Sequence, residues 1–190
     1  MTASGWSLLG LAAIVLLLVL HWGGRKHDAT IERAWLPRDL QDAELAYAEQ
    51  RFQAKAPVAL VARVDRAYRQ KNSLLTLVEL KTRHANRVYF ADVIELSAQR
   101  YALQAHIRET VARQAYVLVQ QTGHPQKTPH LVTLLAQDEV VALVKRREAI
   151  LAGMVEPQYT RWPKLCRQCA FRQQCRPAIV NDGEKQGRTK

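Results

Sequence analysis

The sequence lacks the signature motifs of several large enzyme classes. It contains no Gly-rich phosphate-binding loop, no His-Glu-x-x-His zinc motif and no Gly-x-Ser-x-Gly turn around a serine nucleophile. We therefore expect neither ATP use nor a bound nucleotide cofactor. Cysteine is also scarce. The chain has three Cys residues, and they are clustered at Cys166, Cys169 and Cys175. An odd, clustered trio is a poor basis for disulfides and indicates a metal or cluster site in a reducing compartment.

Acidic residues are few relative to basic ones. The 190 residues include 28 Lys and Arg against 17 Asp and Glu, which gives a formal net charge of +11. The excess is uneven, since residues 161–190 contain eight basic and two acidic side chains. Such a charge indicates a polyanionic partner, either nucleic acid or an acidic membrane surface.

One long stretch, Gly5 to Trp22, has no charged residue. As a helix it would extend about 27 Å, close to the roughly 30 Å hydrocarbon thickness of a bilayer. A secretory signal peptide would need basic residues before this stretch and a small-x-small cleavage site after it, and neither is present. We therefore expect an uncleaved, single-pass transmembrane helix. Arg25 and Lys26 follow it directly, so the positive-inside rule places the rest of the chain in the cytoplasm.

By composition the chain divides into a transmembrane anchor (1–22), a polar linker (23–36), a folded core (37–160), a Cys-containing basic segment (161–177) and a disordered tail (178–190). Within the core, apolar periodicity predicts three helices and four strands, and therefore an α/β (or α+β) fold. The expected helices span about 37–52, 92–112 and 137–151; the expected strands span about 58–68, 74–81, 116–120 and 131–135. The first two strands should form a hairpin through the polar turn 69–73.

The strand expected at 74–81 ends in an unusual pair of charges. Glu79 and Lys81 are two residues apart, so both side chains leave the same face of the strand. A carboxylate and an ammonium at the end of an apolar strand need each other, a metal or a substrate. The preceding strand also ends near a carboxylate, Asp65.

This arrangement suits metal-dependent cleavage of phosphodiesters. Asp65 and Glu79 would supply carboxylate ligands for a divalent cation, and the main-chain carbonyl of Leu80 a third oxygen. Lys81 would orient or help deprotonate the attacking water, or neutralise charge that develops on phosphorus. The alternative for the Glu79–Lys81 pair is a solvated salt bridge without catalytic meaning.

The segments from Val61 to Asp65 and from Val78 to Thr82 resemble the "D … ExK" core of the PD-(D/E)XK nucleases. More closely, they are similar to the RecB-type branch and to the CRISPR-associated adaptation exonucleases. The resemblance covers about residues 37–177. It implies a restriction-endonuclease-like core, with a central mixed sheet flanked by helices, and a Mg²⁺- or Mn²⁺-dependent deoxyribonuclease, an exonuclease by analogy.

Further site residues come from the same resemblance. The family has a Gln motif on the helix after the ExK strand; we carry it over to Gln99, although in one register Glu95 takes the place of the family's Gln. The family's upstream metal ligand is a His or Glu, for which His27, Glu44 and Glu49 are candidates.

The C-terminal trio Cys166, Cys169 and Cys175 matches the family's iron-sulfur cysteines, with zinc as the alternative. A 4Fe-4S cluster requires a fourth ligand; His27 is a candidate, but it cannot also be the catalytic ligand. The basic loop after the ExK strand, with Arg83 and Arg87, is expected to contact phosphate.

Three functions follow from these patterns. The first is a membrane-anchored, metal-dependent DNA nuclease. The second is a nuclease-like module that binds nucleic acid at the membrane without cutting it. The third is a protein that uses its basic tail and anchor to bind anionic lipid, with the acidic pair only structural.

Overall fold

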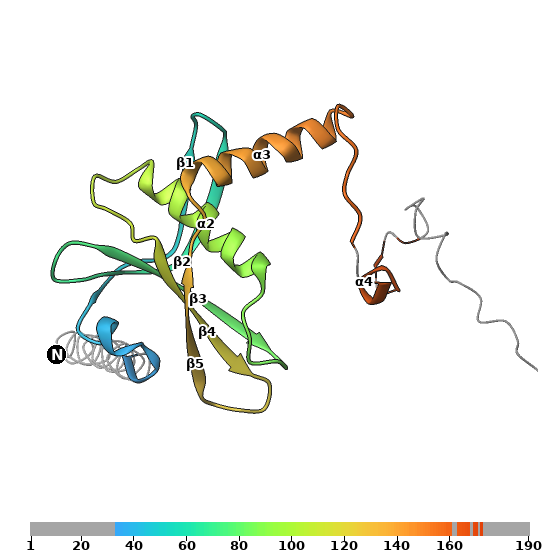
Figure 1. Cartoon of the computed structure of the whole chain (residues 1–190). Helices are drawn as coiled ribbons and strands as arrows, with labels where there is room; N and C mark the ends of the chain where they lie inside the picture. The colour runs from blue at the N-terminus through green and yellow to red at the C-terminus, as the bar shows by residue number, and fades with distance from the viewer. Residues whose placement is uncertain (1–32, 161–162, 168, 171, 173–190) are drawn as a thin grey trace, which may run out of the picture. The chain divides into compact units, whose positions relative to one another are not determined.

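The computed structural model describes residues 33–160, 163–167, 169, 170 and 172 (Figure 1). The predicted transmembrane helix in 1–22, His27, Cys175 and the tail 178–190 lie outside the described residues. Within the described part of the chain, no helix is long and apolar enough to cross a membrane. The chain divides into two compact units, residues 1–145 and 146–190.

The first unit is built on a five-stranded sheet in the order β1-β2-β3-β4-β5. β1, β2 and β3 pair antiparallel in sequence, β3 and β4 pair parallel, and β4 and β5 pair antiparallel. The parallel pair requires a crossover, which helix α2 provides. These findings confirm the expected mixed sheet flanked by helices. The strands are β1 (Glu44–Ala54), β2 (Leu60–Arg69), β3 (Leu75–Arg83), β4 (Gln114–Gln121) and β5 (Lys127–Thr133); α2 is Phe90–Gln104.

The prediction of a helix at 37–52 is wrong. The segment contains only the short 3-10 helix η1 (Arg38–Leu40), after which the chain becomes β1. Its apolar residues fit a helical repeat, but along β1 the buried residues are Phe52 and Ala54, which are two apart as on one face of a strand. Pairing along nearly the whole of β2 therefore overrides a local sequence rich in helix formers.

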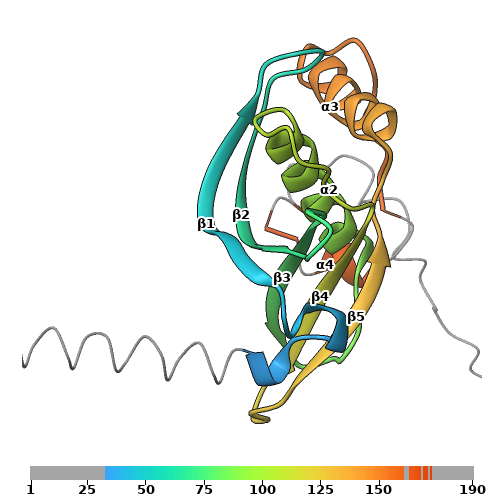
Figure 2. The ribbon, with the colours of Figure 1, turned by 90° about the vertical axis from the view of Figure 1, so that its left-hand side faces the viewer.

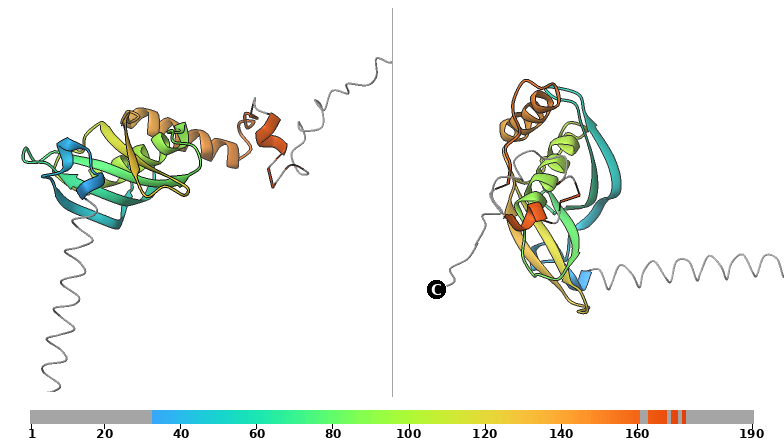
Figure 3. Two further views of the ribbon diagram at one scale, coloured as in Figure 1. Left: turned by 90° about the horizontal axis from the view of Figure 1, so that it is seen from below. Right: turned by 90° about the vertical axis from the view of Figure 1, so that its right-hand side faces the viewer.

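Helix α2 covers one face of the sheet and contacts β1, β2 and β3. Figure 2 and the right-hand view of Figure 3 show the β1–β2 hairpin curving alongside this helix. Leu77 and Val117 point to the α2 side and lie in the main hydrophobic core. Their neighbours Val78 and Leu118 point the other way and pack against Leu36, Leu40 and Ala43, the segment around η1. The sheet is therefore covered on both faces.

Helix α3 (Gln137–Leu151) matches its predicted span. α2 ends at Gln104, eight residues before the predicted end. Val140, near the start of α3, packs with Ala54, Val58 and Tyr101 in a third small core. Among the described residues of the second unit, the regular elements are the end of α3 and the short helix α4 (Pro163–Arg167).

Candidate active site

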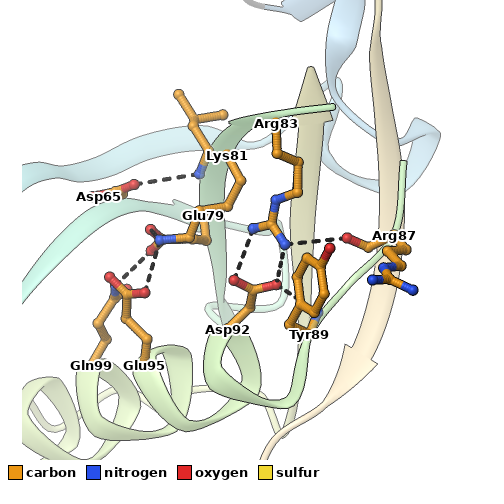
Figure 4. Close-up of polar contacts among 10 residues, drawn as sticks. Asp65, Glu79, Lys81, Arg83, Arg87, Tyr89, Asp92, Glu95 and Gln99 are labelled. Carbon is orange, nitrogen blue, oxygen red and sulfur yellow. Dashed lines mark hydrogen bonds and ion pairs between the residues drawn. The ribbon is translucent and has the colours of Figure 1, made fainter. Parts of the chain in front are cut away.

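The face of β3 that lies beneath α2 changes from apolar to charged along the strand. Leu75 and Leu77 are completely buried in the main core. The next residues on this face are Glu79, only 2% exposed, and Lys81, whose side chain is 24% exposed. Alternation along a strand thus places a carboxylate and an ammonium where the core gives way to solvent (Figure 4).

Asp65 lies beside Glu79 on the neighbouring strand. The antiparallel register of β2 and β3 pairs Arg66 with Val78, so Asp65 and Glu79 occupy the next position along the two strands. Oδ2 of Asp65 accepts a hydrogen bond of 3.4 Å from the backbone nitrogen of Leu80. The negative charge of Asp65 also raises the pKa of Glu79, so the two side chains lie close together. The structure therefore brings together the two carboxylates that the sequence selected.

Both carboxylate oxygens of Glu79 have partners. Oε1 lies 2.7 Å from Nζ of Lys81, and Oε2 accepts a hydrogen bond of 2.7 Å from Nε2 of Gln99. Lys81 is held from the other side by Oε2 of Glu95, at 2.8 Å. Gln99 is 2% exposed, and its Oε1 is buried without a hydrogen-bond partner among the described residues. The amide thus offers one unused acceptor inside the site.

The ionisation of the pair follows from burial and neighbours. Desolvation raises the pKa of Glu79, and the nearby negative charges of Asp65 and Glu95 raise it further. Hydrogen bonds from Lys81 and Gln99 lower it. The resulting pKa of Glu79 is about 7. For Lys81, desolvation lowers the pKa, but hydrogen bonds to Glu79 and Glu95 outweigh it and raise the pKa above its ordinary value. Lys81 therefore stays protonated at neutral pH.

The sequence named Glu95 only as an alternative at the family's Gln position, and its contact with Lys81 was not predicted. Glu95 precedes Gln99 by four residues, so both side chains lie on one face of α2, directed toward β3 (Figure 4). That spacing was visible in the sequence. Its meaning depends on which face of α2 meets the sheet, and this is fixed only by tertiary packing.

A second ion pair, between Arg83 and Asp92, lies at the end of β3. Arg83 donates two hydrogen bonds to Asp92, of 2.9 and 3.0 Å, and Asp92 also accepts one of 2.8 Å from the backbone nitrogen of Tyr89. The Asp92 carboxylate thereby ties the start of α2 to the end of β3. Arg83, expected to contact phosphate, is instead engaged within the protein, while the exposed Arg87 lies over the Tyr89 ring at 4.7 Å (Figure 4).

Two of the three upstream ligand candidates, Glu44 and Glu49, lie on β1 rather than on a helix. Glu44 pairs with Arg69 at 3.0 Å, and Glu49 pairs with Arg63. Glu49 lies in β1 between residues that pair with Arg66 and Val64, which places its backbone next to Asp65. In the described part of the chain, no three His, Cys, Asp or Glu side chains gather as a metal site. Asp65 and Glu79 are thus the adjacent carboxylates of the site, and the nearby Glu95 carboxylate pairs with Lys81.

Two of the three cysteines are described, and both carry free thiols. The backbone nitrogen of Cys169 donates to the carbonyl of Cys166 at 3.2 Å, and that of Arg172 donates to the carbonyl of Cys169 at 3.1 Å. Cys166 is half-buried and Cys169 exposed. Cys166 and Cys169 therefore stand at the two ends of a single tight turn, the arrangement in which a C-x2-C pair binds one metal.

The match to a known protein family agrees with this geometry. A family model for the PD-(D/E)XK nuclease superfamily matches residues 3–176. Among solved structures, the crystal structure of a protein designated SSO0001 is similar over 92% of this chain and 75% of that chain, with 15% sequence identity and a TM-score of 0.48. No curated protein sequence matches the chain.

Proposed function

Because the chain belongs to the PD-(D/E)XK nuclease superfamily, we propose that it is a metal-dependent deoxyribonuclease that hydrolyses phosphodiester bonds. The observation that carries this proposal is the meeting of Asp65 and Glu79 on adjacent strands, with Lys81 on the same face. A structural salt bridge would require the Glu79–Lys81 pair alone. It would not require a second carboxylate beside it.

The side chains fit Mg²⁺ or Mn²⁺. Such hard cations take oxygen ligands and are often held by one or two carboxylates, with several waters retained. Asp65 and Glu79 are those carboxylates, and we propose the Leu80 carbonyl as a further oxygen. The unused, buried Oε1 of Gln99 is another oxygen of suitable chemistry beside Glu79. A bound cation would supply Lewis acidity toward the phosphate and the attacking water.

Lys81 serves as a fixed positive charge in this proposal. Its ammonium lies between Glu79 and Glu95, and its raised pKa keeps it protonated. It is therefore suited to stabilise negative charge that builds on the phosphate, or to orient the attacking water, rather than to remove a proton. Of the three roles that the sequence left open, this proposal keeps two and drops removal of a proton from the water.

Placement at the membrane is a separate proposal. We propose that Gly5–Trp22 anchors the chain in a single pass, with the nuclease unit on the cytoplasmic side. Its support is the uncharged length of that segment and the Arg25–Lys26 pair that follows it. Carbonate extraction of membranes, with protease protection of intact cells, tests both parts; release of the chain by carbonate would contradict the anchor.

We further propose that the chain lies in the RecB-type branch, close to the CRISPR-associated adaptation exonucleases, and that its Cys trio holds a 4Fe-4S cluster, with zinc as the alternative. The support is the order of the motifs and the free thiols of Cys166 and Cys169 on one turn. Anaerobic purification tests this part. Absorbance near 400 nm with bound iron is expected, and a colourless protein with bound zinc would contradict the cluster.

A non-cutting, nucleic-acid-binding module is the second candidate. The observation in its favour is that both Glu79 oxygens and the Lys81 ammonium already have partners within the protein. Binding of DNA without cleavage in Mg²⁺ or Mn²⁺, with a steep dependence on salt, would select this candidate over the enzyme.

The central experiment uses the full chain in detergent with end-labelled linear DNA, single- and double-stranded, in Mg²⁺, Mn²⁺ or chelator. We expect cation-dependent cleavage that falls at least a hundredfold in Glu79→Gln and in Lys81→Ala, a size typical for removing electrostatic stabilisation. Lys71→Ala is the matched control, since the Lys71 side chain is 88% exposed. Equal cleavage by Lys81→Ala and Lys71→Ala would contradict the proposed site.

A further inference from the structure

A cavity of about 370 Å³ opens on the side of α2 away from Glu79. Its volume is within the usual range of small-molecule sites. The lining comes from the β1–β2 connection, from α2 and from the start of α3, all within the first unit; it includes Ala56, Ser97, Arg100, Tyr101, Gln104 and Gln137.

Helix geometry separates this cavity from the candidate active site. With 3.6 residues per turn, successive side chains are about 100° apart around the axis. Glu95 and Gln99 lie on the face directed toward β3, whereas Gln104 lies about 180° around the helix from Glu95. The two sites therefore use opposite sides of α2.

Arg100 is the distinctive residue of the cavity. It is half-buried, and its Nε donates a hydrogen bond of 3.1 Å to the carbonyl of Val111. Within the described part of the chain, no carboxylate pairs with it, and its two terminal nitrogens have no hydrogen-bond partner. Burial lowers the pKa of Arg100, and the nearby positive charge of Arg113 lowers it further. A partly desolvated guanidinium of this kind is stabilised by an anion.

Three other polar side chains of the lining, Ser97, Tyr101 and Gln104, already have hydrogen-bond partners. The Ser97 hydroxyl donates to the Val93 carbonyl and accepts from the Leu135 nitrogen. The Gln104 amide bonds the backbone of the loop after α2 through both of its ends, and the Tyr101 hydroxyl donates to the Ala56 carbonyl. Apart from the exposed amide of Gln137, the open donors of the cavity are thus those of Arg100.

We propose that this cavity binds the phosphate group of a nucleotide, free or at the end of a DNA strand. The planar fork of Arg100 matches two phosphate oxygens. The apolar wall, with Ala56, Val140 and the Tyr101 ring, suits the less polar parts of such a ligand. The inference that the cavity recognises phosphate is independent of the proposed nuclease activity. The inference that this phosphate belongs to a nucleotide rests on the proposed nuclease activity.

Calorimetric titration of the full chain in chelator tests the proposal. One arm uses deoxyadenosine 5′-monophosphate, and a second compares a short oligonucleotide with and without a 5′-phosphate. We expect binding in at least one arm, weakened at least tenfold in Arg100→Gln. A preference for the phosphorylated oligonucleotide would identify a strand end as the ligand, and binding of the mononucleotide alone would identify a free nucleotide; either outcome supports the site.

Charge substitutions at Gln137 test the site independently, in case Arg100→Gln misfolds. Gln137 is the first residue of α3, where a negative charge favours the helix. Gln137→Glu should therefore fold normally yet weaken binding, while Gln137→Lys should strengthen it. Wild-type affinity in both Arg100→Gln and Gln137→Glu, or no binding by the wild-type chain, would overturn the proposal.

Glu79→Gln separates this site from the active site. The variant should keep wild-type nucleotide affinity while losing cleavage, and loss of both together would assign the binding to the active site and overturn the proposal. If the wild-type chain binds the nucleotide but cuts no DNA, the proposed nuclease function fails while the phosphate site stands.

Discussion

Nε2 of Gln99 lies 2.7 Å from Oε2 of Glu79, so helix α2 meets strand β3 at a carboxylate that is almost completely buried. A buried carboxylate is costly unless it is neutral, paired or bound to a cation. Here burial and neighbouring charges bring its pKa to about 7. The protonation of Glu79 would therefore couple the stability of the fold to the cation binding that we propose for the site.

The first prediction concerns pH and stability. The folded-state pKa of Glu79, about 7, exceeds its ordinary value of 4.5, so between these values the folded chain binds more protons than the unfolded chain. Stability should thus fall as pH rises from 4.5 to 7, by an amount on the order of 2 kcal/mol. Urea denaturation at pH 5 and pH 8 measures this. Glu79→Gln should lose most of the dependence, and an unchanged pH slope in that variant would contradict it.

The second prediction concerns cation binding. Cation affinity should rise with pH as Glu79 ionises, because a carboxylate must be ionised to act as a ligand. Gln99→Leu removes a hydrogen bond that lowers the pKa of Glu79. We expect the midpoint of Mn²⁺ binding to move upward by about one pH unit. Paramagnetic resonance of free Mn²⁺ against pH measures it, with the exposed Gln53→Leu as control. A downward shift would contradict the role assigned to Gln99.

The third prediction concerns the Arg83–Asp92 pair. Their side chains are 16% and 8% exposed, and Asp92 also holds the backbone at Tyr89. Asp92→Asn leaves a buried guanidinium without its charged partner and should destabilise the fold by about 3 kcal/mol. Asp138→Asn, at an exposed position in the first turn of α3, should cost less than about 1 kcal/mol. Equal effects in urea denaturation would show that the pair is no more than a surface contact.

The sequence predicted the hairpin of β2 and β3, the later strands and α3 because each has a local periodicity that its environment supports. It failed at β1, where Leu45, Ala46 and Ala48 stand among other helix-forming residues. The strand forms because its backbone pairs with β2. Such pairing is a long-range effect that a single window of sequence does not contain.

The candidate site divides in the same way. Asp65, Glu79 and Lys81 could be found from strand alternation and their order in the chain, because short-range geometry fixes their faces. Glu95 and the Arg83–Asp92 pair could not, since they depend on where α2 crosses β3. The parallel pairing of β3 with β4 decides that crossing, and it joins segments about 40 residues apart.

The last prediction tests whether two residues on one face of α2 shift the pKa of Glu79 in opposite directions. Glu95 raises the pKa of Glu79 through its negative charge, whereas Gln99, one turn later, lowers it by a hydrogen bond. Glu95→Gln should therefore move the midpoint of Mn²⁺ binding to lower pH, opposite to Gln99→Leu, while Lys81 remains paired with Glu79. The two variants are compared by the same Mn²⁺ titration. Shifts of the same sign would mean that α2 acts on Glu79 through burial alone, because only specific contacts give the two residues opposite effects.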